Sequence, residues 1–301
     1  MNKGKLTLTA ILDLVSWNTL TASIFPFLIG VLYSQYHYHT VNGLDMIIYF
    51  IVALTMDLIV NVMDNLNDYE VAMEQNADEL LKINPVYNYH LTKNQVLNIV
   101  WIMVVVALGL GIWLVIRTSW PLLILGLLAI GIAIFYSKFF QNTAIGELLS
   151  GLTMGFLIIF SGVYINTYST FTWSWKEIGE IFLVSLPNTL WIANMMLANN
   201  TCDIQYDKKC GRTTYPIKVG AKKAVSVFIW FNIFAIVAIV LAVILKLVPW
   251  TMLLILLITP FIYNQCKIFK EKQEKSSTFL AAVKILAIGS LVQFITFLIM
   301  V

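Results

Sequence analysis

Apolar residues form nine long runs along the chain, separated by segments that are mostly polar. Each run is long enough for an α-helix to cross a membrane, which takes about 17 to 25 residues. The pattern therefore predicts nine transmembrane helices. The predicted ranges are residues 14–35, 44–63, 96–116, 119–137, 144–166, 178–198, 224–246, 249–266 and 278–300.

The composition agrees with this pattern. Of the 301 residues, 59% are hydrophobic and only 12% are charged, and the mean hydropathy is +0.83. Soluble domains are about 45–50% apolar and about 25% charged. We therefore expect an all-α, polytopic membrane protein in which residues 1–301 form a single transmembrane domain.

The positive charges predict how the helices are oriented. With a cytoplasmic N-terminus, nearly all of the 19 Lys and Arg residues fall in cytoplasmic segments, where short loops retain positive charge. The exceptions are Arg117, Lys176, Lys246 and Lys284. We expect a protein of the bacterial plasma membrane whose C-terminus lies outside. This topology also explains the net charge of +3, so we expect membrane lipid as a partner and no nucleic acid.

Two long cytoplasmic segments, residues 64–95 and 199–223, begin with acidic residues at the end of a predicted helix. Polar residues recur at helical spacing through both helix ends: Asp57, Asn61, Asp64 and Asp68 at the first, and Asn199, Asn200, Asp203 and Asp207 at the second. Such spacing places side chains along one face of a helix. Because the second and sixth predicted helices end alike, we expect two similar four-helix halves followed by a ninth helix.

Carboxylates gathered at a membrane boundary repel one another, and burial drives protons onto them unless a cation intervenes. Mg²⁺ prefers oxygen ligands and commonly joins carboxylates to substrate phosphates. Basic residues such as Arg212 and Lys218 follow the second acidic group and supply charge for the same phosphate oxygens. The pattern predicts a site for a diphosphate held by Mg²⁺. The alternative is that these residues are solvated helix ends at the lipid headgroups.

Three stretches of the sequence carry a more specific pattern. Residues 19–30 read TLTASIFPFLIG, residues 64–69 read DNLNDY, and residues 199–220 read NNTCDIQYDKKCGRTTYPIKVG. Together they resemble the UbiA-type intramembrane prenyltransferases, and within that family the 1,4-dihydroxy-2-naphthoate polyprenyltransferases of menaquinone synthesis. Weaker agreement extends to Tyr136, Gly146 and Glu147.

This resemblance implies nine helices around a central cavity, with a polyprenyl diphosphate and its Mg²⁺ at the cytoplasmic mouth. It implies transfer of the prenyl chain to an aromatic acceptor, 1,4-dihydroxy-2-naphthoate. The matching positions are Asp64, Asp68, Asp203 and Asp207 as catalytic, metal-binding carboxylates, and Asn200, Arg212, Lys218 and Lys93 around the diphosphate. Asp64 stands where the family usually has Asn.

The chain also departs from the family pattern at two further positions of the acidic motifs. Val71 stands where the first motif has another Asp, and Cys202 stands where an Arg usually precedes Asp203. A different aromatic acceptor, such as 4-hydroxybenzoate, and a non-catalytic protein that binds prenyl lipids or quinones therefore stay open. A transporter is the third alternative, although its ionisable residues are expected nearer the middle of the membrane. The length of the prenyl chain and the oligomeric state also stay open.

Overall fold

A computed structural model describes residues 6–75, 78–135, 143–209 and 211–301, and these residues form helices and loops without β-strands. In chain order the elements are α1 (Leu8–Leu14), η1 (Trp17–Thr19), α2 (Thr21–Tyr38), α3 (Gly43–Glu74), α4 (Asp78–Leu81), α5 (Pro85–Asn88), α6 (Lys93–Arg117), α7 (Pro121–Phe135), α8 (Gly146–Gly151), the π-helical η3 (Leu152–Leu157), α9 (Ile158–Thr167), α10 (Trp175–Cys202), α11 (Ile204–Lys209), α12 (Tyr215–Val219), α13 (Ala221–Ile244), the 3₁₀-helical η4 (Trp250–Ile258), α14 (Thr259–Glu271) and α15 (Phe279–Leu298). The all-α class is confirmed.

In the described part of the chain, seven helical segments are long and apolar enough to cross a membrane. They are Gly43–Glu74, Lys93–Arg117, Gly146–Thr167, Trp175–Cys202, Ala221–Ile244, Trp250–Glu271 and Phe279–Leu298. α2 and α7 occupy the other two predicted ranges, but α7 is described for only 15 residues. A polytopic membrane protein is thus confirmed, and the count of nine spans stays a prediction.

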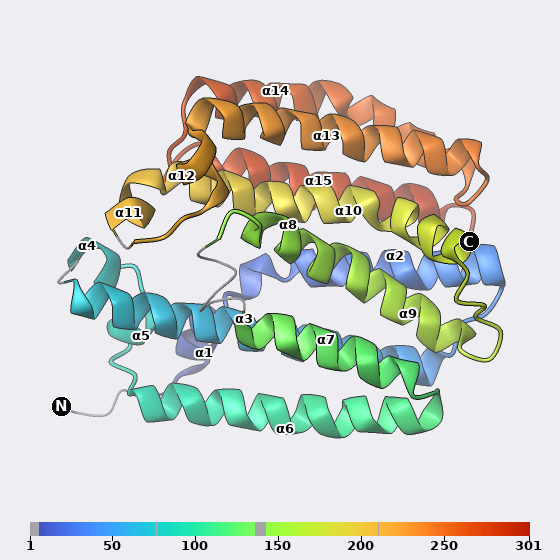
Figure 1. Ribbon diagram of the computed structural model, residues 1–301, viewed down its shortest axis with the longest axis horizontal. Helices are drawn as coiled ribbons and strands as arrows, with labels where there is room; N and C mark the ends of the chain where they lie inside the picture. Colours follow the sequence, from blue (N-terminus) through green and yellow to red (C-terminus); the bar gives the residue numbers. More distant parts are fainter. Residues whose placement is uncertain (1–5, 76–77, 136–142, 210) are drawn as a thin grey trace.

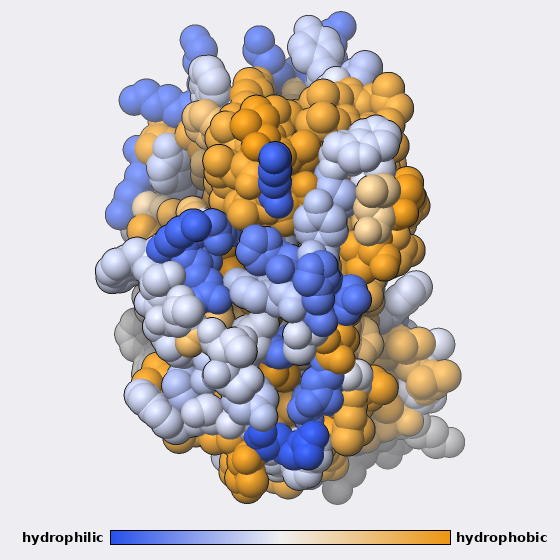
Figure 2. Space-filling model, turned by 90° about the vertical axis from the view of Figure 1, so that its right-hand side faces the viewer, coloured by the Kyte–Doolittle hydropathy of each residue, from blue (hydrophilic) through white to orange (hydrophobic). Residues whose placement is uncertain are grey.

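The long helices lie side by side, and both acidic segments are at the same end of the bundle (Figure 1). α4, α5, α11 and α12 lie at the left in this view, whereas α15 ends at the right. Figure 2 looks onto the right-hand end, where polar residues gather across the face and hydrophobic residues flank them. This distribution suits a polar end in water and apolar flanks in lipid.

α3 extends well beyond the predicted helix and contains the whole first acidic motif. Its 32 residues span about 48 Å at 1.5 Å per residue, whereas the apolar part of a bilayer is about 30 Å thick. The helix continues because Val62 and Leu66 keep a helical spacing and are buried against Val86 and Val96. The first motif is therefore held on a rigid helix that emerges from the membrane.

α10 is the most buried candidate span, because 72% of the residues in an 18-residue apolar stretch of this helix are buried inside the protein. Gly151 and Gly155 allow α8 and η3 to pack directly against its backbone. A Cβ on Gly155 would lie 2.4 Å from the Thr189 Cα, and one on Gly151 would lie 2.3 Å from the Thr189 carbonyl oxygen. Small residues four positions apart permit such close contact between membrane helices. The contact places the beginning of α8 beside the end of α10.

Gly155→Ala is expected to destabilise the protein, because the added methyl group meets helix backbone that cannot easily move aside. We expect a loss of about 1–3 kcal/mol in the free energy of unfolding, measured as a lower thermal unfolding midpoint in detergent. Gly179→Ala is the matched control, since nothing lies within 4 Å of a Cβ added there. Equal midpoints for the two variants would contradict this packing.

Candidate active site

The first acidic motif offers two carboxylates one turn apart on α3, Asp64 and Asp68. Arg212 donates a hydrogen bond from Nη2 to Asp68 Oδ1 over 2.9 Å. Asp64 lies within electrostatic range of both Asp68 and Arg212. Its Oδ1 is buried and has no hydrogen-bond partner among the described residues. The first motif therefore has one carboxylate paired with a cation and one with a free oxygen.

The second acidic motif spans a break between two helices. α10 ends at Cys202, Asp203 caps it, and α11 begins at Ile204. The helical spacing expected through this motif is thus interrupted at Asp203. The Asp207 N–H still donates to the Asp203 carbonyl oxygen over 2.8 Å, so the two aspartates remain about one turn apart.

A glycine turn at the end of α11 directs Arg212 back toward the acids. The Arg212 N–H donates to the Asp207 carbonyl oxygen over 2.9 Å. The Gly211 N–H donates to the Lys208 carbonyl oxygen over 3.2 Å. This pair of bonds is typical of a helix that ends in a left-handed residue, and Gly211 has φ +70°, which glycine adopts without strain. Arg212 Nη1 therefore reaches Asp207 Oδ1 at 3.2 Å.

Asp207 is a deeply buried acid that keeps an available oxygen. Its side chain is 1% exposed, and Oδ2 has no hydrogen-bond partner within the described residues. Burial raises the pKa of Asp207 to about 6, against the lowering effect of Arg212, so the carboxylate is mostly ionised at neutral pH. Burial acts to lower the pKa of Arg212, but Asp68 and Asp207 outweigh it and the pKa lies above its usual value.

Asp203 pairs with a residue that the sequence analysis missed, Lys275 in the loop between α14 and α15. Lys275 Nζ lies 2.6 Å from Asp203 Oδ2, and it also donates to Asn199 Oδ1. In the sequence, Lys275 is one of several lysines in a cytoplasmic loop. No motif distinguishes it from its neighbours, so only the folded chain identifies it.

Asn200 connects the second motif to Glu147 at the beginning of α8. Asn200 Nδ2 donates to Glu147 Oε1 over 2.8 Å, and the Tyr215 N–H donates to the same oxygen over 3.2 Å. Glu147 is 4% exposed, and its Oε2 has no partner in the part of the chain that is described. The weak family agreement at Glu147 was the one signal for it; Tyr136, which shared that signal, lies outside the described residues.

Lys93 and Lys218 lie at the edge of this arrangement. Lys93 Nζ is 2.6 Å from Glu70 Oε1, and its side chain is 60% exposed, so its observed partner is not one of the four predicted aspartates. Lys218 is exposed on the short helix α12. Their contact with a diphosphate stays a prediction.

The four predicted metal ligands are not gathered into one cluster. Within the described ranges, no three His, Cys, Asp or Glu side chains lie close enough together to hold a metal ion. Arg212 is shared by Asp68 and Asp207, and Lys275 neutralises Asp203. Three of the four carboxylates are therefore paired with protein cations, two of them with the same guanidinium.

The site nevertheless offers oxygens that suit a divalent cation. Asp64 Oδ1, Asp207 Oδ2 and Glu147 Oε2 are buried without hydrogen-bond partners among the described residues. A buried polar atom without a partner is costly, and a carboxylate especially so. Hard cations such as Mg²⁺ take carboxylate oxygens as ligands. The chemistry of these donor atoms therefore suits a magnesium ion, although the described side chains are not gathered around one point.

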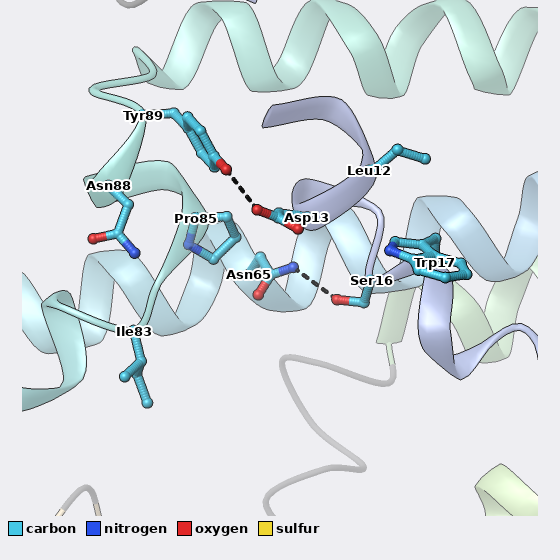
Figure 3. A pocket seen from close by; sticks show the side chains of 9 residues that line it. All are labelled: Leu12, Asp13, Ser16, Trp17, Asn65, Ile83, Pro85, Asn88 and Tyr89. Atoms are coloured by element: carbon cyan, nitrogen blue, oxygen red, sulfur yellow. Dashed lines mark hydrogen bonds between the residues drawn. The ribbon is translucent and has the colours of Figure 1, made fainter. Parts of the chain in front are cut away.

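A separate cavity of about 340 Å³ lies between α1, α3 and the chain around α5 (Figure 3). Its lining residues are Leu12, Asp13, Ser16, Trp17, Asn65, Ile83, Pro85, Asn88 and Tyr89, and none of them belongs to the predicted site. Tyr89 Oη donates to Asp13 Oδ2 over 2.6 Å, and Asn65 Nδ2 donates to Ser16 Oγ over 3.2 Å. These bonds fasten the chain before α2 to the end of α5 and to α3.

Comparison with known proteins agrees with this geometry. The model of the UbiA prenyltransferase family matches residues 23–288, a range that contains both acidic motifs, Glu147 and Lys275. The chain belongs to the UbiA prenyltransferase family. The resemblance that the sequence motifs indicated is confirmed.

This UbiA-family chain is 26% identical to the 1,4-dihydroxy-2-naphthoate octaprenyltransferase of Bacillus subtilis (strain 168) over 212 residues. The match covers 69% of this chain and 65% of that relative, which is just under two thirds of the relative's length. It links the chain to an enzyme that acts on a dihydroxynaphthoate.

Solved structures of UbiA homologues share the fold. The homologue from Aeropyrum pernix K1 has a TM-score of 0.69 at 17% identity and covers 90% of this chain and 97% of its own. A digeranylgeranylglyceryl phosphate synthase has a TM-score of 0.66 at 19% identity, with 97% of each chain covered. The Archaeoglobus fulgidus homologue bound to GPP and Mg²⁺ has a TM-score of 0.62 at 12% identity, and the match covers 96% of this chain and 99% of that homologue.

Proposed function

We propose that this protein transfers a polyprenyl chain from a prenyl diphosphate to 1,4-dihydroxy-2-naphthoate, in the synthesis of demethylmenaquinone and menaquinone. The observation that carries the proposal is the contact of Arg212 with both acidic motifs, through Asp68 and Asp207. The family and the function of the B. subtilis relative support the reaction and the acceptor. The A. fulgidus homologue, with GPP and Mg²⁺ bound, supports the donor and the metal.

In this proposal, the chain's own residues hold and neutralise the diphosphate. The ligands of the metal are Asp64, Asp68, Asp203 and Asp207, and the diphosphate lies among Asn200, Arg212, Lys218 and Lys93. Bound Mg²⁺ supplies positive charge that stabilises the leaving diphosphate. Arg212 adds charge-assisted hydrogen bonds to the same oxygens, and the apolar helices exclude water.

The reaction breaks the bond between the diphosphate oxygen and the allylic carbon of the prenyl chain. The electron-rich ring of the acceptor forms the new carbon–carbon bond to that allylic carbon, and the ring loses its carboxylate as carbon dioxide. The residues around the diphosphate favour the first event because they stabilise the negative charge that develops on the leaving oxygens. Selection of the acceptor depends on the shape of the cavity.

The proposed setting is the plasma membrane of a bacterium, with both acidic motifs facing the cytoplasm. Their position at one end of the bundle supports a shared compartment, and the distribution of Lys and Arg supports the cytoplasmic side. The proposed domain is one unit with two similar four-helix halves and a ninth helix.

A competition assay tests the acceptor. Purified protein receives equal amounts of 1,4-dihydroxy-2-naphthoate and 4-hydroxybenzoate with one prenyl diphosphate and Mg²⁺, and mass spectrometry resolves the products. A dominant naphthoate product supports the proposal, whereas a dominant benzoate product shows that the acceptor is wrong. Bound but unreacted prenyl diphosphate indicates a non-catalytic lipid-binding protein. If the protein neither binds the prenyl diphosphate nor forms a product, the result contradicts the enzyme class and favours a transporter.

Removal of divalent cations is expected to lower turnover by at least about a hundredfold, because even the loss of a residue that only orients a metal ligand lowers metal affinity or activity by about tenfold to a hundredfold. Excess EDTA removes the cation, and added Mg²⁺ should restore both turnover and the binding of radiolabelled inorganic diphosphate. The control is gel filtration in EDTA, in which the protein should stay monodisperse because its helices pack without the metal. Full turnover in excess EDTA would contradict the metal site.

A further inference from the structure

We propose that Lys275 is a further residue that binds the substrate's diphosphate, and that in the ligand-free protein its ammonium group instead neutralises Asp203. The inference rests on the proposed prenyl transfer and adds to it a residue from the loop between α14 and α15. This loop lies far along the chain from both acidic motifs. The proposal brings a third segment of the protein into the diphosphate site.

The position of the ammonium group is defined by three neighbours. Lys275 Nζ lies 2.6 Å from Asp203 Oδ2, donates to Asn199 Oδ1, and lies 5.2 Å from the centre of the Phe279 ring. The side chains of Lys275 and Asp203 are 49% and 25% exposed. The group is therefore held at the second acidic motif and is still accessible to a ligand that enters from solution.

The loop that carries Lys275 is folded around its neighbour Glu274. The Glu274 N–H donates to Thr278 Oγ1 over 2.8 Å, and Ser277 Oγ donates to Glu274 Oε2 over 2.9 Å. The N–H groups of Thr278 and Phe279 both donate to the Glu274 carbonyl oxygen, over 3.0 and 3.1 Å. A loop fixed in this way presents Lys275 in one direction, which lowers the entropy lost when a ligand binds.

The charges at Asp203 explain why the ammonium group changes partner. A divalent cation on Asp203 repels the ammonium group of Lys275, because both then lie on the same carboxylate. A diphosphate brings several negative charges and many acceptor oxygens to the same place. The ammonium group sits on a flexible four-carbon stem with three donors, so a short movement transfers it from the carboxylate to a phosphate oxygen.

A role limited to stability does not fit this pair. Half-exposed ion pairs contribute little to the stability of the folded state, and Lys275 is about half exposed. The same loop contains a natural control, Lys272, which lies 2.6 Å from Glu274 and has a 64% exposed side chain. Loss of either lysine leaves the fold intact, and only loss of Lys275 alters the acidic site.

The test compares Lys275→Gln, Lys275→Arg and the control Lys272→Gln. We measure the dissociation constant of inorganic diphosphate with Mg²⁺, and KM and kcat with a prenyl diphosphate. Lys275→Gln is expected to raise the dissociation constant and KM about tenfold to a hundredfold, as loss of one charge-assisted hydrogen bond does, with a smaller change in kcat. Lys275→Arg should recover most of the binding, and Lys272→Gln should match the wild type.

Binding of Mn²⁺ alone, followed by electron paramagnetic resonance, separates this role from a general loss of structure. Lys275→Gln removes a competing cation from Asp203, so we expect it to bind Mn²⁺ at least as tightly as the wild type while it binds diphosphate more weakly. Weaker binding of both Mn²⁺ and diphosphate by Lys275→Gln would overturn the proposal. Equal diphosphate binding by Lys275→Gln and Lys272→Gln would also overturn it. Absence of diphosphate binding by the wild type would overturn the proposed function itself.

Discussion

Asp207→Asn is expected to lower the rate of prenyl transfer by at least about a hundredfold. Even the removal of a residue that only contacts a metal ligand lowers metal affinity or activity by about tenfold to a hundredfold. The substitution keeps the shape of the side chain but removes the negative charge. Asp207 is 1% exposed, pairs with Arg212 through Oδ1, and leaves Oδ2 free among the described residues. The loss therefore weakens both the proposed metal site and the placement of Arg212. Turnover with saturating Mg²⁺ measures it.

Asp45→Asn provides a closely matched control. Asp45 is also 1% exposed and pairs with Arg117 Nε over 3.2 Å, but it lies in the first turn of α3, at the opposite end from the acidic motif. Both variants should elute as folded protein in gel filtration. We expect Asp45→Asn to retain prenyl transfer. A wild-type rate in Asp207→Asn, or an equal loss in both variants, would show that the site is assigned wrongly.

Arg212→Gln is expected to lower kcat/KM by about a hundredfold or more, since it removes charge-assisted hydrogen bonds at two positions. The guanidinium contacts Asp68 at 2.9 Å and Asp207 at 3.2 Å. Without it, the two carboxylates lose their shared counter-charge and the diphosphate loses a donor. Arg212→Lys should recover only part of the activity, because an ammonium group cannot span both acids as a planar guanidinium does.

Arg117→Gln serves as the control for this substitution, because Arg117 pairs with buried Asp45 away from the site. Steady-state kinetics over a range of prenyl diphosphate concentrations measure both variants. Full activity in Arg212→Lys would show that charge alone matters at this position. Full activity in Arg212→Gln would remove Arg212 from the site.

The sequence by itself determined the class of the protein and the family. The bilayer sets the length of an apolar helix, so the runs of hydrophobic residues predicted most of the helices that the structure contains. The acidic motifs were equally readable, because the spacing of Asp64 and Asp68 on one helix is local to the chain. The break at Asp203 was less visible, because helix ends depend on a few hydrogen bonds.

Only the tertiary structure decided which charges meet. Arg212 reaches Asp68 across 144 positions, Lys275 reaches Asp203 across 72, and Asn200 reaches Glu147 across 53. Such pairs depend on how the helices pack, and that depends on contacts that hydropathy does not record. The contact of α8 and η3 with α10, for example, requires glycine at two positions, because glycine has no side chain to separate the helices. Local spacing therefore placed the carboxylates on their helices, and helix packing brought Arg212 to Asp68 and Lys275 to Asp203.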